Sequence, residues 1–277
     1  MHISDADRET FERDGAVCLR GVYDRSAVES LLDAWDRIVA DPHASGLVPP
    51  EEEFRPVGDR ATVISRPSYA VDAFRTFIHE SPVPALMGEL MNQREVGFYW
   101  DTIFAKDPGS TWETAWHTDA GAIAVRGNDM INVWTPLTPV TRDNSLEVVA
   151  GTHRNDVLYW PKSPNGARLE RPRDRDFCPD FGAHRGEDGY RFITWDMEPG
   201  DVVFMHLKTA HYNRGNPTEH RRVALATWWY GDDIVWDPRP ECETGHPEAP
   251  FADMPRGRHP DHPLFPVLWR ASGATRS

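Results

Sequence analysis

The sequence is poor in cysteine and in lysine, and each shortage excludes a class of protein. Its three cysteines, Cys18, Cys178 and Cys242, are widely separated and include no Cys-x-x-Cys pair. They therefore form neither a disulfide framework nor a thiolate zinc site, and they fit a reducing compartment. Only three of the 277 residues are lysine, and the net charge is -14. Nucleic-acid binding needs a basic surface, so we expect no nucleic-acid partner.

Long apolar runs are also absent. No stretch comes near the roughly 18 uninterrupted apolar residues that a membrane span requires, so we expect no membrane partner. The first seven residues, MHISDAD, lack the basic and then apolar segments of a secretory signal, and a cytoplasmic location is expected. Hydrophobic residues make up 39% and charged residues 27% of the chain, as in an ordinary globular protein. Without an internal repeat or a low-complexity linker, residues 1–277 are expected to form a single domain.

The N-terminal third, about residues 1–92, has helical patterns. Residues 5–45 are expected to be helical, because Ser26 to Glu29 match a capping box and the apolar residues that follow recur at helical spacing. A second helix is expected over residues 81–92, which have two prolines near their start.

From residue 95 the sequence changes to short runs rich in β-branched and aromatic residues, separated by Gly, Pro and Asp. Such runs are typical of strands, and they cover residues 96–104, 130–135, 200–205 and 223–230. Helices followed by many short strands predict a mainly β fold with flanking α-helices, an antiparallel sandwich or barrel. We expect its core over about 95–230, with an arginine-rich insert at about 160–195 and a C-terminal extension at 231–277. Long segments without periodicity often form lids or mouth loops.

A His-x-Asp triplet, His117 to Asp119, is the first candidate for a metal site. An oxygen-activating iron needs few protein ligands, and two histidines with one carboxylate leave positions open for cosubstrate and O2. On a strand, residues i and i+2 point the same way, so one strand can deliver both ligands of the triplet. Two further triplets, starting at His246 and His259, have proline at the centre, which is unfavourable inside a sheet. We therefore expect the metal ligands at the first triplet.

The second histidine ligand is expected from a later strand, and two residues are candidates. His206 ends the run that starts at Gly200, and His211 follows five residues later. His211 is preferred because the residues after it indicate a turn, with Arg221 and Arg222 opening the next strand. An arginine on that strand can reach back beside the metal and bind a carboxylate through two hydrogen bonds.

Several motifs in order resemble the phytanoyl-CoA dioxygenase family of Fe(II)- and 2-oxoglutarate-dependent oxygenases. They are KDPGSTWETAWHTD from Lys106 to Asp119, the segment from Val133 to His153, the segment from Pro199 to His211, residues 216–224, and the opening residues 11–21. The similarity covers most of residues 8–230, and ordered motifs together are more specific than any single one.

The resemblance implies a fold, a metal site and a cosubstrate site. The implied fold is a double-stranded β-helix, a cupin-like jelly roll. The implied iron ligands are His117, Asp119 and His211, and the implied 2-oxoglutarate-binding residues are Arg222, Trp134, Thr102 and Asn213. Related halogenases have a small residue in place of the carboxylate ligand. Because Asp119 keeps the acid, hydroxylation or another oxidation is expected.

The predicted function is oxidation of a small organic substrate with Fe(II), O2 and 2-oxoglutarate, releasing succinate and CO2. A small polar or secondary metabolite is favoured as the substrate, and no oligomeric state is predicted. Within the family the alternative is an acyl-CoA hydroxylase. Outside it, the alternatives are a jelly-roll metalloenzyme that does not use 2-oxoglutarate and a non-catalytic β-sandwich binding module. The insert's arginines either bind an anionic substrate or lie in a solvated loop; they are Arg168, Arg171, Arg173 and Arg175.

Overall fold

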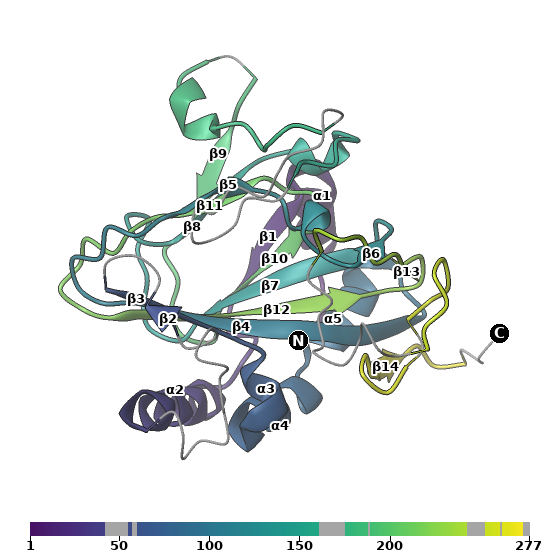
Figure 1. The fold of residues 1–277 in the computed structure, drawn as a ribbon, viewed down its shortest axis with the longest axis horizontal. Coiled ribbons are helices and arrows are strands. Elements are labelled where there is room, and N and C mark those ends of the chain that lie inside the picture. The colour runs from purple at the N-terminus through teal and green to yellow at the C-terminus, as the bar shows by residue number, and fades with distance from the viewer. Residues whose placement is uncertain are drawn as a thin grey trace.

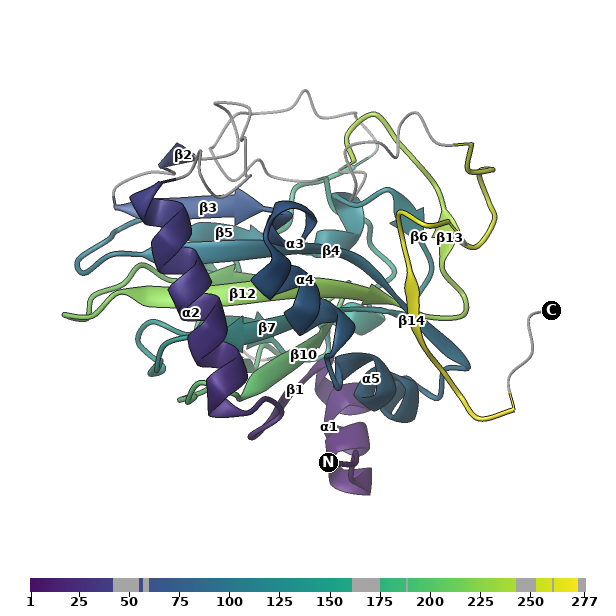
Figure 2. The same ribbon diagram turned by 90° about the horizontal axis from the view of Figure 1, so that it is seen from below.

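The computed structural model describes residues 1–41, 55–56, 60–160, 175–187, 189–242, 253–260 and 262–273. Two antiparallel sheets face each other, and helices cover the outer face of the larger sheet (Figure 1, Figure 2). This is the arrangement of a jelly roll, in which the residues between the two sheets are sheltered from solvent.

The larger sheet is built around three long neighbouring strands. Its order along the hydrogen-bonded path is β1 (Ala16–Leu19), β10 (Val202–His206), β7 (Met130–Pro136), β12 (Arg222–Tyr230), β4 (Glu95–Lys106), β3 (Ala61–Ser65) and β2 (Arg55–Pro56), and β14 (Val267–Arg270) also pairs with β4. The smaller sheet has the order β5 (Thr114–His117), β11 (His211–Asn213), β8 (Leu146–Val149) and β9 (Phe192–Thr194). A separate pair joins β13 (Val235–Trp236) to β6 (Val125–Arg126).

Most of the helices lie on the outer side of the larger sheet, and the first helix lies beside its edge strand β1 (Figure 1, Figure 2). They are α1 (Asp5–Asp14), α2 (Arg25–Ala40), α3 (Pro67–Ala70), α4 (Asp72–His79) and α5 (Val83–Met91). The apolar face of α2, with Leu31 and Trp35, packs with Phe74 of α4 and with outward-facing sheet residues such as Leu225 in one hydrophobic core. Short 3-10 turns, η1 (Asp119–Gly121), η2 (Thr152–Arg154) and η3 (Phe181–His184), connect strands elsewhere.

A second core fills the space between the sheets. Successive residues of a strand point to opposite faces, so Val223 and Leu225 of β12 pack toward the helices while Ala224 and Ala226 face the smaller sheet. Every residue of β12 is buried, since both faces of this strand are covered. The small alanine side chains on the inner face leave room between the sheets.

The structure agrees with the four predicted strands and with the helix expected at 81–92, which correspond to β4, β7, β10, β12 and α5. Within the segment 5–45 expected to be helical, residues 5–14 and 25–40 are helices, but 16–19 form β1, because Gly15 adopts a left-handed conformation (φ 77) that ends α1. The capping box is at Ser4 and Asp7 of α1, whereas Ser26 lies inside α2.

The predicted limits of the helical part and of the core also need correction. Strands β1, β2 and β3 lie within residues 1–92, and β14 of the C-terminal extension adds to the same sheet. Strand β9 of the insert pairs with β8, so that part of the insert belongs to the smaller sheet. Some predictions fall outside the described residues: residues 42–45 of the expected helical segment, His246, and Arg168, Arg171 and Arg173 of the insert.

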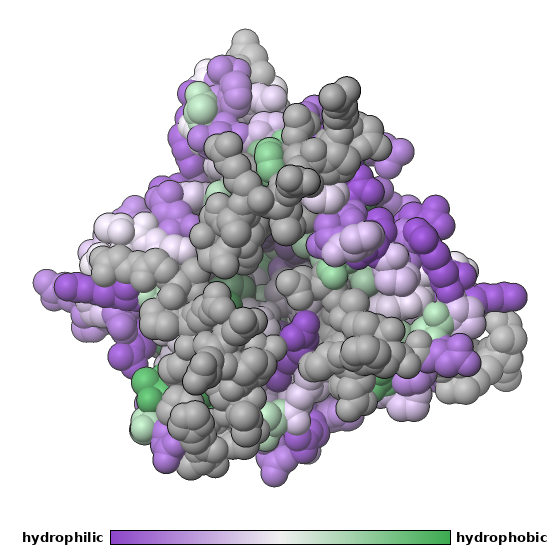
Figure 3. Space-filling view, viewed as in Figure 1, coloured by the Kyte–Doolittle hydropathy of each residue, from purple (hydrophilic) through white to green (hydrophobic). Residues whose placement is uncertain are grey.

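Among the described residues, no helix combines the length and the apolar character needed to cross a membrane. In the view of Figure 3 the described surface is predominantly hydrophilic, with hydrophobic residues in small patches.

Candidate metal centre and cosubstrate pocket

Two histidines meet where β5 and β11 pair across the smaller sheet. His117 ends β5, His211 begins β11, and the two residues are direct partners in the antiparallel register, with ring centroids 4.0 Å apart. Directly opposed residues of a strand pair project to the same face. The pairing therefore brings together two imidazoles that are far apart in the sequence.

Asp119 completes the group from a turn, because the chain leaves β5 after His117 and Asp119 opens η1. The expected delivery of both ligands by one strand is therefore wrong, although the backbone N–H of Asp119 is held by the carbonyl of Leu207 at 3.1 Å. Its Oδ1 lies 3.6 Å from Nε2 of His117 and 3.7 Å from Nε2 of His211. One ligand atom from each of the three residues lies within 4.8 Å of the others.

Backbone carbonyls set the orientation of both imidazole rings. Nδ1 of His117 lies 2.8 Å from the carbonyl oxygen of Ala115, and Nδ1 of His211 lies 3.0 Å from that of Thr209. A carbonyl can only accept a hydrogen bond, so each Nδ1 carries a proton, and in the neutral ring Nε2 then has the free lone pair. Such second-shell bonds fix the tautomer that a metal ligand needs.

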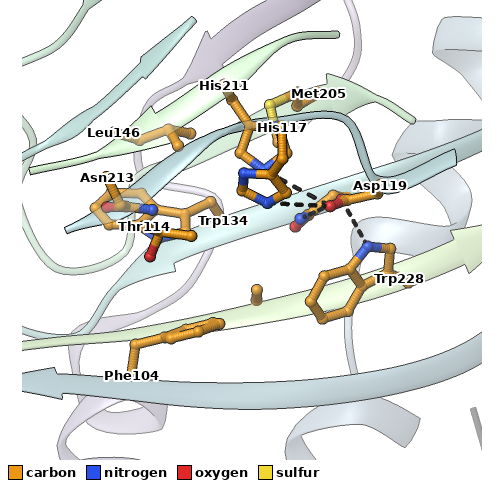
Figure 4. Close-up of a pocket in the computed structure, with 12 residues that line it drawn as sticks. Phe104, Thr114, His117, Asp119, Trp134, Leu146, Met205, His211, Asn213 and Trp228 are labelled. Carbon is orange, nitrogen blue, oxygen red and sulfur yellow. Dashed lines mark hydrogen bonds and ion pairs between the residues drawn. The ribbon is translucent and has the colours of Figure 1, made fainter. Parts of the chain in front are cut away.

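Two side chains orient the carboxylate of Asp119. Its Oδ2 accepts a hydrogen bond from Asn132 Nδ2 at 2.9 Å. It accepts another from the indole Nε1 of Trp228 at 2.8 Å (Figure 4). Asn132 and Trp228 are themselves direct partners between β7 and β12. Oδ1 is thereby left to face the two Nε2 atoms.

The three ligand atoms are better placed to bind a divalent metal than to form hydrogen bonds with one another. All three are acceptors in this tautomer, and separations of 3.6 Å and 3.7 Å are too long for hydrogen bonds between them. Two neutral imidazoles and one carboxylate on one face are the donor set of non-haem iron(II), which leaves further coordination positions open.

The group lines a cavity between the sheets (Figure 4). The wall consists of Phe104, Thr114, His117, Asp119, Asn132, Trp134, Leu146, Met205, His211, Asn213, Ala226 and Trp228. Both polar and aromatic side chains are present, as expected for a site that orients a small polar ligand and excludes water.

Arg222 is almost completely buried, with 2% of its surface exposed. Its Nη1 donates hydrogen bonds to the carbonyl of Asn144 at 2.8 Å and to Oδ1 of the cavity residue Asn213 at 2.9 Å. Burial lowers the pKa of Arg222 to about 10. Arg221 instead points to solvent and pairs with Asp107 at 2.5 Å.

The other predicted residues are divided between the cavity and the surrounding core. Trp134 and Asn213 line the cavity. Thr102 is buried in β4, two residues before Phe104, so it faces the same side of the strand without being part of the wall. His206 is outside the group: its ring packs near Phe11 and His153, and burial lowers its pKa to about 3.

Sequence reasoning missed Asn132 and Trp228. A polar residue in the apolar run Met130 to Trp134 was a usable signal, since a buried amide requires partners. Nothing in the sequence marks Trp228 among the neighbouring aromatic residues, because its role depends on the register of β12.

The fold and the site define a jelly-roll protein with a candidate two-histidine, one-carboxylate metal centre. The chain belongs to the phytanoyl-CoA dioxygenase (PhyH) family, whose model matches residues 11–224. The predicted fold class and family are confirmed.

Known proteins similar to this chain are consistent with that family. A probable phytanoyl-CoA dioxygenase of Caenorhabditis elegans is 33% identical over 122 residues, which are 43% of this chain and 36% of that protein. The chain thus spans about a third of the length of this curated relative.

Solved structures resemble the chain over nearly all of its length. The carbocyclase SnoK from nogalamycin biosynthesis has a TM-score of 0.70 at 17% identity and covers 96% of both chains. The epimerase SnoN, in complex with Fe3+, alpha ketoglutarate and nogalamycin RO, has a TM-score of 0.70 at 19% identity, covering 96% of this chain and 98% of SnoN. EctD from S. alaskensis, with 2-oxoglutarate and 5-hydroxyectoine, has a TM-score of 0.69 at 17% identity, covering 89% of this chain and 86% of EctD. At these identities the likeness is one of fold.

Proposed function

We propose that this chain binds Fe(II) through His117, Asp119 and His211 and oxidises a small organic molecule with O2 and 2-oxoglutarate. The observation that carries the proposal is the convergence of one ligand atom from each of these three residues on one point of a cavity wall. Hydroxylation is the expected reaction, with succinate and CO2 as coproducts.

Iron, when bound with 2-oxoglutarate and O2, supplies the oxidising chemistry, and the protein supplies binding, orientation and exclusion of water. His117 and His211 present their Nε2 atoms, while Asn132 and Trp228 hold Asp119 so that Oδ1 faces the metal position. Arg222 binds the distal carboxylate of 2-oxoglutarate. Trp134 and Phe104 form an apolar part of the cavity wall that keeps water out.

The carboxylate of Asp119 also bears on the type of oxidation. A halogenase of this fold needs room for a halide where Asp119 stands. Because Asp119 is present and firmly oriented by two hydrogen bonds, we propose oxygen insertion or a related oxidation in place of halogenation.

A small polar or secondary metabolite is the substrate class that we propose. The molecules named with two similar structures, nogalamycin RO with SnoN and 5-hydroxyectoine with EctD, are consistent with this class. The name of the family points to acyl-CoA as the alternative, but an acidic chain with a net charge of -14 and three lysines offers no obvious site for its phosphates. The three free cysteine thiols fit the reducing interior of a cell.

An anaerobic titration with Fe(II) and 2-oxoglutarate tests the proposal. A visible metal-to-ligand charge-transfer band requires both the metal and a chelating keto acid, so we expect it only when both are added. Metal binding without the band would indicate a jelly-roll metalloenzyme that does not use 2-oxoglutarate. Absence of metal binding would indicate a non-catalytic module and would overturn the proposal.

A further inference from the structure

Two buried basic side chains lie side by side at the end of the inner sheet face. Lys106 ends β4, Arg222 begins β12, and the two are direct partners in the antiparallel register. Directly opposed side chains project to the same face, here the face on which Phe104 lines the cavity. Lys106 has 0% and Arg222 2% of its surface exposed. We call these two residues the cationic pair.

Both members of the cationic pair reach across the space between the sheets to the end of β11. Nζ of Lys106 donates to the carbonyls of Asn213 at 3.3 Å and Arg214 at 2.5 Å. Nη1 of Arg222 donates to the side chain of the same Asn213. Since Asn213 lines the cavity, the cationic pair lies directly behind the cavity wall.

The cationic pair has no carboxylate partner within the described part of the chain. Arg222 bonds only to a carbonyl and an amide oxygen there, and its Nε is buried without a hydrogen bond. Glu113 is exposed and acts on Lys106 only through its charge. Arg214 forms its ion pair with Glu147. On the other side of Lys106, its partner in β3 is the uncharged Ala61. Two like charges buried together are unfavourable unless an anion compensates them.

The hydrogen bonds of Lys106 match the neutral amine and leave room for one more bond in the ammonium. A neutral amine has two N–H groups, and two carbonyls accept them. An ammonium has a third N–H, which has no acceptor among the described residues. The ring of Trp112, centred 4.6 Å from Nζ, can form a cation–π contact with the charged form. Burial and then the charge of Arg222 lower the pKa of Lys106 to about 6.

We propose that Lys106 is a second cationic ligand for the distal carboxylate of 2-oxoglutarate, beside Arg222, and that it takes up a proton when the cosubstrate binds. This inference rests on the proposed function. The neutral amine of the free protein gains a proton from the solvent, and the new N–H donates to the carboxylate. Above about pH 6 the free lysine is mostly neutral. The apparent affinity for 2-oxoglutarate therefore falls as the pH rises, by up to about tenfold per pH unit.

Anaerobic calorimetry of the metal-loaded protein with 2-oxoglutarate, near pH 7.5, tests the inference. Repeating the titration in buffers of different ionisation enthalpy measures the protons taken up. We expect about one proton per 2-oxoglutarate for the wild type and none for Lys106→Met. Lys106→Met should also weaken binding of 2-oxoglutarate by about tenfold or more while leaving metal affinity unchanged.

Lys208→Met is the matched control, because Lys208 pairs with Asn128 and Asp156 away from the cavity wall. It should bind like the wild type. Wild-type binding without proton uptake, or unchanged affinity in a folded Lys106→Met variant, would overturn the inference. If the Lys106→Met variant does not fold, the number of protons that the wild type takes up per 2-oxoglutarate still tests the inference. Failure of the metal-loaded wild type to bind 2-oxoglutarate would instead refute the proposed function, whereas binding that depends on Arg222 alone would refute only the role of Lys106.

Discussion

His117 and His211 each use Nδ1 on a backbone carbonyl, and this choice of partner prepares Nε2 of both rings for a metal. The same division is seen in Asp119, where Oδ2 is bonded within the protein and Oδ1 faces the histidines. The orientation of the candidate ligands is thus built into the protein and does not depend on a metal.

At this residue scale, His117→Ala, Asp119→Ala and His211→Ala should each abolish binding of Fe(II) in a protein that stays folded. Each change removes one of only three ligand atoms. Metal content after reconstitution and far-UV circular dichroism provide the measurement. His206→Ala is the control and should retain iron and substantial activity. An iron-free His206→Ala beside an iron-binding His211→Ala would show that the other histidine is the ligand.

Trp228→Phe should weaken Fe(II) binding by about 10- to 100-fold, as is typical when a partner of a metal ligand is lost. The change removes the N–H that holds Oδ2 of Asp119 and keeps most of the aromatic volume. Trp229→Phe is the matched control, because its indole bonds Thr227 on the other face of β12. Equilibrium titration with Fe(II) compares the two variants. Equal affinities would mean that Trp228 does not position Asp119.

At the scale of elements, the register of β12 decides which of two neighbouring arginines faces inward. Arg222→Gln should weaken the binding of 2-oxoglutarate by on the order of 2–5 kcal/mol, since a buried charge pair is lost. Arg221→Gln should cost less than about 1 kcal/mol, because Arg221 and Asp107 form an exposed pair. The apparent Km for 2-oxoglutarate measures both effects. Loss confined to Arg221→Gln would show that the inward face is the other one.

The C-terminal extension holds the turn that follows Asp119. Arg239 donates to the carbonyls of Ala120 at 3.4 Å and Ile123 at 2.9 Å, and it also pairs with Asp237 and Glu241. Glu241 in turn binds Arg175 of the insert at 2.7 Å. Residues outside the match to the family model thus support a candidate iron ligand.

Arg239→Gln should therefore lower the affinity for Fe(II) about tenfold and destabilise the fold by on the order of 1–3 kcal/mol. Arg256→Gln is the control. Arg256 also pairs with Asp237, but its side chain is exposed and does not reach the turn. It should change stability by less than about 1 kcal/mol and leave metal affinity unchanged. Metal titration and thermal unfolding separate the two variants. Identical metal affinities of the Arg239→Gln and Arg256→Gln variants would show that the C-terminal extension does not support the metal site.

At the scale of the whole molecule, ligand binding between the two sheets should stabilise the native state. With metal present and 2-oxoglutarate at 100 times its Kd, the gain is about 2.7 kcal/mol. For a chain of this size that raises Tm by about 5–10 °C. Pyruvate keeps the keto acid but lacks the distal carboxylate for Arg222, so its shift should be smaller at the same concentration. Equal shifts, measured by differential scanning fluorimetry, would argue against the arginine site.

Much of this protein was determined by local sequence. The runs at 96–104, 130–135, 200–205 and 223–230 indicated four strands of the larger sheet, because β-branched and aromatic residues fit a pleated, buried surface. The ordered motifs indicated the family and the jelly roll. The residue types at His117, Asp119 and His211 indicated iron, because two histidines and one carboxylate form a donor set that suits iron(II).

Tertiary structure decided the rest, because long-range pairing and register are not written in any one segment. The opposition of His117 to His211 and that of Asn132 to Trp228 exist only once the strands pair. Local patterns also failed at Gly15, where a left-handed residue ends α1 and starts a strand within an expected helix. The cationic pair depends on the same cause: Lys106 and Arg222 are 116 residues apart in the sequence, and the register of β4 and β12 makes them neighbours.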